Sequence, residues 1–172
     1  MIPIYIGIAH RFDVIKSLTW NSIMENSDAD VSVSLLYPAI EEGCTGFSNV
    51  RYQIEYGIYL DCDMIVLGDV AELWAYRQPG KFVCLEDGST EVAVIDCRHD
   101  CRNKHEQDKL PKACTIPLTW NVEDYRLGQQ PIPADTKLFH FTDLKTQPWF
   151  YTHPNPHAVR LYQKYDLGPI RE

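Results

Sequence analysis

Residues 57–70 have the sequence Gly-Ile-Tyr-Leu-Asp-Cys-Asp-Met-Ile-Val-Leu-Gly-Asp-Val, in which the apolar run over residues 57–67 is interrupted by two carboxylates, Asp61 and Asp63. A buried carboxylate is costly unless it is paired or bound to a metal. Alternate side chains of a strand lie on one face, so Asp61 and Asp63 are predicted to point at a common site. A shared divalent cation would hold these two like charges together. The alternative is a strand that ends in an acidic turn and binds no metal.

The length and composition of the chain predict one domain over residues 1–172, large enough to bury a substantial core. A net charge of −8 argues against binding to nucleic acid or to an anionic membrane surface. No apolar run reaches the ~20 residues of a membrane span. Residues 1–9 lack a basic leader and are predicted to form a first strand rather than a signal peptide. We therefore expect a cytoplasmic protein.

The chain has six cysteines, and none of them forms a Cys-x-x-Cys pair. Cys97 and Cys101, with His99 between them, resemble half of a zinc site, but no second pair has a matching spacing. Cys62 and Cys84 lie in apolar runs and are predicted to be small core residues. Reduced thiols are the expected state in a cytoplasmic protein.

Strand and helix patterns alternate along the chain. The strands are predicted at residues 3–9, 31–37, 57–62, 81–85, 91–96 and 137–141, and the helices at 12–25, 48–56, 69–76, 99–110 and 155–165. Asp69 is a favourable N-cap for the third of these helices. Such an order predicts an α/β fold with a mostly parallel sheet. Ligands bind at the carboxyl ends of parallel strands, where Asp61 and Asp63 would lie.

A second polar position lies far along the chain, in an aromatic run. His140 stands between Phe139 and Phe141. A histidine in such a run is usually a core residue whose hydrogen bonds are satisfied. The two carboxylates elsewhere make a third metal ligand the alternative. Carboxylate oxygens suit Mg²⁺ and Mn²⁺, and an added imidazole favours Mn²⁺.

Residues 59–74 resemble the Asp-x-Asp region of GT-A glycosyltransferases, above all the family 8 group that includes glycogenin and bacterial galactosyl- and glucosyltransferases. Further segments resemble motifs of that family in the same order, and the likeness extends from residue 1 to about residue 150. These segments are 47–51, 106–110 followed by 118–121, and 140–143 through 148–149. The resemblance implies a compact GT-A domain with a mostly parallel central sheet flanked by helices.

The resemblance also implies an activity and a metal. The enzyme would transfer a hexose, glucose or galactose, from a UDP-sugar to an acceptor that is a sugar, a lipid or a protein, with retention of anomeric configuration. Asp61, Asp63 and His140 would hold Mn²⁺, with Mg²⁺ as the alternative, and the metal would neutralise the diphosphate that leaves. A homodimer is a further expectation.

Other residues acquire roles only through the resemblance. Asp61 would also approach the ribose, Arg51 would contact the donor phosphate or sugar, and Gln107 would lie at the reacting face of the sugar. The implied catalytic residues are Gln107 and Asp108, and the implied donor-binding residues are Ile8, Ala9, His10, Arg51, Asp61, Cys62, Ser89, Glu106 and Lys145. Without the resemblance, Arg51 is more typical of a surface ion pair, and residues 106–108 are more typical of a solvated helix face.

The chain departs from the family pattern in its short separation of Arg51 and Asp61, in its short overall length and at several single positions. Ala9 stands where an acidic residue is usual, Gln147 stands where a lysine commonly precedes Pro-Trp, and residues 89–91 replace an Asn-x-Gly segment. These changes leave a second hypothesis open, a weakly active or inactive nucleotide-sugar-binding protein. A nucleotidyltransferase is a third, but residues 7–13 lack the Gly-rich basic loop that it would normally carry.

Overall fold

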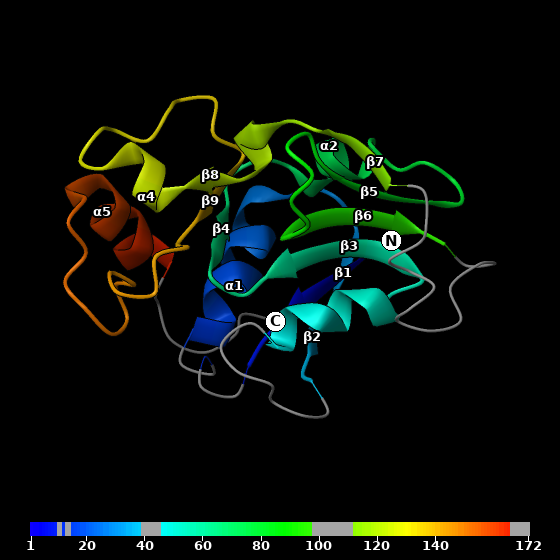
Figure 1. Ribbon diagram of the computed structural model, residues 1–172, viewed down its shortest axis with the longest axis horizontal. Helices are drawn as coiled ribbons and strands as arrows, with labels where there is room; N and C mark the ends of the chain where they lie inside the picture. Colours follow the sequence, from blue (N-terminus) through cyan, green and yellow to red (C-terminus); the bar gives the residue numbers. More distant parts are fainter. Residues whose placement is uncertain (10–11, 13–14, 39–45, 98–111, 166–172) are drawn as a thin grey trace.

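The computed structural model describes residues 1–9, 12, 15–38, 46–97 and 112–165. Its centre is a six-stranded sheet with the strand order β2-β1-β3-β6-β5-β7 (Figure 1). β1 is parallel to β2 and β3, β5 is parallel to β7, and β6 is antiparallel to its neighbours β3 and β5. Within this sheet only β6 is reversed, so the predicted mostly parallel α/β sheet is confirmed. The strands are β1 (Ile2–Gly7), β2 (Val31–Leu36), β3 (Tyr56–Asp61), β5 (Lys81–Leu85), β6 (Val92–Asp96) and β7 (Lys112–Ile116).

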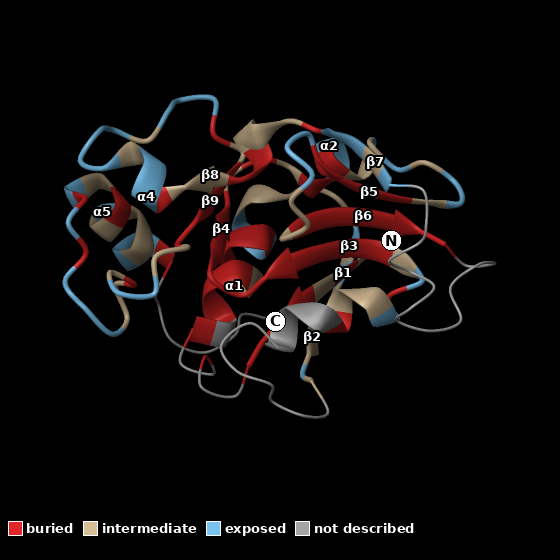
Figure 2. Ribbon diagram, in the orientation of Figure 1, coloured by how far each residue is buried: buried red, intermediate tan, exposed pale blue. Residues whose placement is uncertain are grey.

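Both faces of the central strands are buried (Figure 2). One face places Ile58 and Leu60 of β3 in a large apolar cluster with Leu18 of α1 (Lys16–Asn26). The other face places Tyr59 in a smaller cluster with Val50 of the 3₁₀ helix η2 (Gly46–Gln53). Strands that are covered on both faces have continuous apolar runs rather than alternating ones, as the sequence of β3 has.

A second, three-stranded sheet has the order β4-β9-β8 and lies beside the first (Figure 1). It is formed by β4 (Met64–Val66), β9 (Leu138–His140) and β8 (Val122–Glu123). In the antiparallel pair of β4 and β9, Met64 is the partner of His140. This pairing brings the turn after β3 next to the end of β9. The 3₁₀ helix η3 (Leu118–Trp120) leads into β8, and the helices α4 (Asp124–Leu127) and α5 (Pro156–Tyr165) follow later in the chain.

Polar side chains of α1 satisfy the free edge of β4. The hydroxyl of Thr19 bonds the carbonyl of Met64 at 2.7 Å, and the hydroxyl of Ser22 accepts from the amide of Val66 at 2.9 Å. The amide of Asn26 donates to the carbonyl of Val66 at 3.0 Å. Buried backbone groups need such partners, and in this sheet a helix supplies them in place of a fourth strand.

The helix α2 (Val70–Trp74) begins as predicted, because the Asp69 carboxylate accepts from the Ala71 amide at 3.0 Å. The strands predicted at the six sites are confirmed, with small shifts at their ends. The first helix begins at Lys16 rather than at residue 12. β4, β7 and β8 were not predicted, and the helix predicted at 99–110 lies outside the described residues. None of the helices in the described ranges is long and apolar enough to cross a bilayer.

Candidate metal centre

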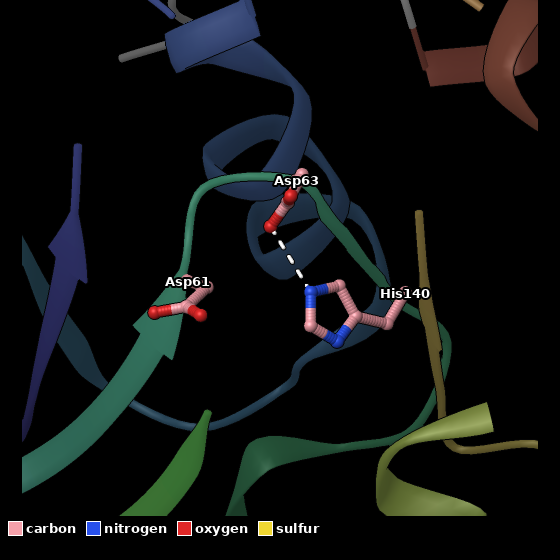
Figure 3. A group of neighbouring side chains, drawn as sticks. All are labelled: Asp61, Asp63 and His140. Carbon is pink, nitrogen blue, oxygen red and sulfur yellow. Dashed lines mark hydrogen bonds and ion pairs between the residues drawn. The ribbon is translucent and has the colours of Figure 1, made fainter. Parts of the chain in front are cut away.

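Asp61, Asp63 and His140 converge on one point at the boundary of the two sheets (Figure 3). Each offers one ligand atom, and these atoms lie within 4.8 Å of one another. The Nε2 atom of His140 is 3.1 Å from Oδ1 of Asp63. All three residues are buried, with exposed fractions of 6%, 7% and 4% in chain order. The sequence therefore identified three residues that the fold brings together.

The reason for the convergence differs from the one predicted. The expectation was that both aspartates share one face of a strand. β3 instead ends at Asp61, and Asp63 lies in the turn that reverses the chain into β4. The Thr19 hydroxyl of α1 lies within donating distance of the carbonyl oxygens of Cys62 and Met64, at 2.8 and 2.7 Å. These contacts hold the turn against α1. A turn, not the pleat of a strand, aims Asp63 at the site.

Two side chains fix the ligands from outside the cluster. Oδ1 of Asn121 lies 2.9 Å from Nδ1 of His140, so an Nδ1–H donates to it, and in the protonated, metal-free imidazole the Nε2–H donates to Asp63. Loss of the Nε2 proton would leave a lone pair directed at the candidate metal position. The amide of Gln147 donates to Oδ2 of Asp63 at 3.3 Å and to the carbonyl of Phe141 at 3.2 Å. Such partners set the orientation and tautomer of metal ligands. Gln147, a departure from the family motif, thus contacts the candidate centre directly.

Tyr59 also fixes Asp61 by a hydrogen bond. Its hydroxyl donates to Oδ1 of Asp61 at 2.5 Å. Burial, and then the charge of Asp61, hold the pKa of Tyr59 well above its usual range, so the phenol stays a hydrogen-bond donor. Gly7 of β1 leaves room for this ring, because a Cβ at Gly7 would lie 2.3 Å from the Tyr59 hydroxyl oxygen.

Gly7→Ala is expected to destabilise the protein by about 1–3 kcal/mol, because the added methyl group must displace the buried Tyr59 ring. The measurement is the free energy of unfolding in urea. Gly88→Ala is the comparison variant. A Cβ at Gly88 meets nothing within 4 Å, so its loss of stability reports only the backbone strain of a residue with φ of +87°. Gly7→Ala in a Tyr59→Phe background should recover part of the loss, and a loss that is unchanged there would contradict the proposed clash.

The electrostatics of the cluster favour an added cation. Burial, and then the charge of Asp63, raise the pKa of Asp61 to about 7. For His140, burial opposes protonation, but the charge of Asp63, its hydrogen bond and the charge of Asp61 outweigh it and raise the pKa to about 9. Without a metal the site therefore retains protons at neutral pH. Two carboxylate oxygens and one imidazole nitrogen fit Mn²⁺, and they also suit Mg²⁺.

The metal-free protein is expected to lose stability at this site as the pH rises. Asp61 has a folded pKa of about 7 against an ordinary value of 3.8, so its contribution is present below about pH 4 and is lost as the pH rises through 7. The measurement is the urea midpoint against pH with EDTA present. The difference between wild type and Asp61→Asn should fall between about pH 4 and 7, and a smaller further fall toward pH 9 is expected because the charge of Asp61 also raises the pKa of His140.

Saturating Mn²⁺ should reverse this trend, because a metal binds the deprotonated ligands and releases their protons. A difference between wild type and Asp61→Asn that rises with pH in EDTA would contradict the raised pKa of Asp61.

Arg51 lies next to Tyr59, the residue that donates to Asp61. Its guanidinium donates to the carbonyl of Thr90 at 2.8 Å and stands over the Tyr59 ring at 5.6 Å from the centroid. Its charge is one of the influences that lower the pKa of Asp61. A fixed positive charge close to the candidate metal is what a donor diphosphate would require.

The other predicted donor residues are spread over several elements. Ile8 and Ala9 are buried just beyond β1, and Cys62 is buried between the two aspartates. The hydroxyl of Ser89 donates to Asp87 at 2.6 Å within its own turn, and Lys145 is exposed after β9. The remaining predicted site residues lie outside the described residues: His10, Glu106, Gln107 and Asp108.

A buried polar cluster fixes the chain immediately after His140. Oδ1 of Asp124 accepts from the amide and the hydroxyl of Thr142, both at 3.0 Å. Oδ2 of Asp124 lies 3.1 Å from Nε2 of His153, and both side chains are only 1% exposed. The amide of Asn155 donates to Nδ1 of His153 at 3.1 Å, so the Nε2–H faces Asp124. Sequence reasoning missed this cluster, whose members carry no recognisable spacing.

The chain is similar to known proteins in its structure, but the comparisons of its sequence found no match. No family model and no curated protein matches the chain. A crystal structure of an active-site mutant of LgtC matches with a TM-score of 0.69 and 11% identity, over 95% of each chain. The galactosyltransferase LgtC in complex with donor and acceptor sugar analogues matches with a TM-score of 0.68 and 10% identity, over 98% of each chain.

The glycosyltransferase GlyE of Streptococcus pneumoniae TIGR4 matches with a TM-score of 0.70 and 12% identity, over 98% of this chain and 61% of GlyE. The chain thus spans about three fifths of the GlyE chain. At these identities the likeness concerns the fold. The chain shares the GT-A fold of these glycosyltransferases, as its sequence predicted.

Proposed function

We propose that this protein is a metal-dependent glycosyltransferase that moves a hexose, glucose or galactose, from a UDP-sugar to an acceptor with retention of configuration. The observation that carries the proposal is the buried cluster of Asp61, Asp63 and His140 at the boundary of the two sheets. It occurs on a fold shared with a galactosyltransferase that was crystallised with donor and acceptor sugar analogues. Two buried carboxylates beside a buried imidazole fit a site for a divalent cation.

A bound Mn²⁺ or Mg²⁺ would act as a Lewis acid on the diphosphate leaving group. The residues of the chain then have distinct roles. Asp61, Asp63 and His140 would hold the ion, while Tyr59 and Asn121 orient two of these ligands. Arg51 adds a positive charge on the donor side. The site is preorganised, so its charges need not reorient as the leaving group becomes more negative.

The remaining expectations are predictions from the sequence resemblance. They include the catalytic roles of Gln107 and Asp108 and the donor contacts of Ile8, Ala9, His10, Ser89, Glu106 and Lys145. The acceptor, a sugar, a lipid or a protein, belongs with them. A single domain over residues 1–172, a homodimer and a cytoplasmic location are separate predictions from the sequence itself.

One observation favours a second candidate function, a nucleotide-sugar-binding protein with little or no turnover. The neutral amide of Gln147 bonds Asp63 at the position where the family motif commonly has a lysine. An amide supplies no charge to a departing diphosphate. Binding through the metal would survive this change, whereas turnover would be slowed.

A donor screen distinguishes these functions. The protein is incubated with UDP-glucose or UDP-galactose in Mn²⁺, Mg²⁺ or EDTA, and both nucleotide-sugar binding and release of UDP are measured. UDP release that requires the metal supports the transferase. Metal-dependent binding without UDP release supports the second function. A protein that binds neither donor in Mn²⁺ would refute both.

A further inference from the structure

Two cysteines face each other at the edge of the large sheet. β7 is the edge strand and runs parallel to β5, and Cys84 of β5 is the register partner of Cys114 of β7. Their sulfur atoms are 3.4 Å apart. Neighbouring strands lie about 4.8 Å apart, which is within the Cα separations of about 4.4–6.8 Å that disulfides span. The backbone therefore already stands at a spacing that permits a cross-link.

The two thiols differ in their access to solution. Cys84 is fully buried in the smaller apolar cluster, which also contains Val50 of η2, whereas Cys114 is exposed. Burial, and then the hydrogen bond to Cys114 and its charge, raise the pKa of Cys84 to about 12. The thiolate is the reactive form of cysteine, so Cys114 is the thiol that a dissolved reagent meets first.

We propose that Cys84 and Cys114 form a redox site that closes reversibly into a disulfide with a small-molecule disulfide such as oxidised glutathione. The Cys114 thiolate attacks one sulfur of the reagent and expels one thiol, which leaves a mixed disulfide. The mixed disulfide removes the hydrogen bond and the charge of Cys114 that help to raise the pKa of Cys84. Cys84 then loses its proton, attacks the Cys114 sulfur and expels the second thiol. The cysteines lose two protons and two electrons in total, and the reagent ends as two thiols.

Closure of this bond would restrain more than the edge strand. β7 leads directly into η3 and Asn121, the residue that bonds His140. Two contacts already tie this stretch to the end of β5, since the Glu86 amide donates to Ile116 at 2.9 Å and its carboxylate accepts from Leu118 at 3.2 Å. A covalent bond at Cys114 would add a third restraint ahead of the segment that orients a candidate metal ligand.

Peptide mapping of the full chain after oxidation with glutathione tests the proposal. Trypsin cuts after lysine and arginine, which places Cys84 in residues 82–98 together with Cys97, and Cys114 in residues 113–126. The experiment is therefore made in Cys97→Ala, so that Cys84 is the only cysteine of its peptide. The expected product is residues 82–98 joined to 113–126, and dithiothreitol should reverse it.

The Cys114→Ser variant should give no such product. Because Cys114 is exposed, this variant tests the cross-link even if Cys84→Ser does not fold. Cys114→Ser combined with Thr115→Cys is a matched control, because it moves the thiol by one residue along the same exposed strand. This control should stay unlinked. Oxidised protein should melt roughly 5–15 °C above reduced protein, as expected for a cross-link that closes a loop of this length.

The proposal is overturned if Cys114 stops at the mixed disulfide with glutathione, if it pairs with Cys44, Cys62 or Cys101, or if the thiols do not oxidise. It is equally overturned if the shifted thiol of the control cross-links as readily as Cys114. None of these readouts depends on glycosyltransferase activity.

Discussion

Asp63→Asn is expected to lower metal-dependent UDP release by more than about 100-fold. Loss of a group that merely supports a metal ligand already lowers metal affinity or activity 10- to 100-fold, and Asp63 is itself a proposed ligand. Asparagine has nearly the same size, so the contacts of the turn with Thr19 and Phe141 should persist. The fold should therefore be retained, at the cost of the ion pair between Asp63 and His140, and the main effect should appear in metal binding.

The measurement has two parts: UDP release in Mn²⁺, and the rise in Tm that Mn²⁺ produces. Both should vanish in Asp63→Asn. Asp28→Asn is the matched control, because Asp28 is exposed in the connection between α1 and β2, and it should behave as wild type in both assays. If Asp63→Asn binds Mn²⁺ with wild-type affinity, the proposed metal centre is wrong.

Asp124→Ala is expected to destabilise the protein by about 3–5 kcal/mol, because it leaves several buried hydrogen-bond donors without their acceptor, each at a cost of about 1–3 kcal/mol. The change removes the acceptor for His153 and for both groups of Thr142. The measurement is the free energy of unfolding in urea. Asp124→Asn should be milder, because its amide oxygen can still accept from the Thr142 backbone.

Glu72→Ala provides the comparison at an exposed ion pair. Glu72 pairs with Lys137 at 3.0 Å, and both side chains are more than a third exposed. Exposed pairs contribute about 0–1 kcal/mol, so this variant should unfold close to wild type. An Asp124→Ala variant that loses no more stability than Glu72→Ala would show that the buried cluster contributes little.

The parts of the fold that the sequence predicted are those with strong local signals. β1 and β3 are continuous apolar runs, and Asp69 precedes its helix as a cap. β4 and β8 have three and two residues, too few for a period to be visible. Their existence depends on pairing with β9, which no local pattern encodes.

The candidate site divides in the same way. Asp61 and Asp63 were visible because charge interrupts an apolar run, and His140 because the chain already offered two carboxylates. The partners that orient them depend on tertiary structure alone. Asn121 and Gln147 meet His140 and Asp63 through loops whose paths cannot be inferred from spacing. Gln147 was noticed only as a departure from the family motif.

Thr19, Ser22 and Asn26 interrupt the apolar pattern of α1 and would be taken for a solvated face. They instead cover the outer edge of β4, where a strand would otherwise offer unpaired amides and carbonyls. Exposed strand edges recruit strands from other molecules and promote aggregation. α1 thus protects the small sheet from association between chains. A redesign that made this helix face uniformly apolar would remove the hydrogen bonds that cover the edge of β4, in the sheet that carries His140.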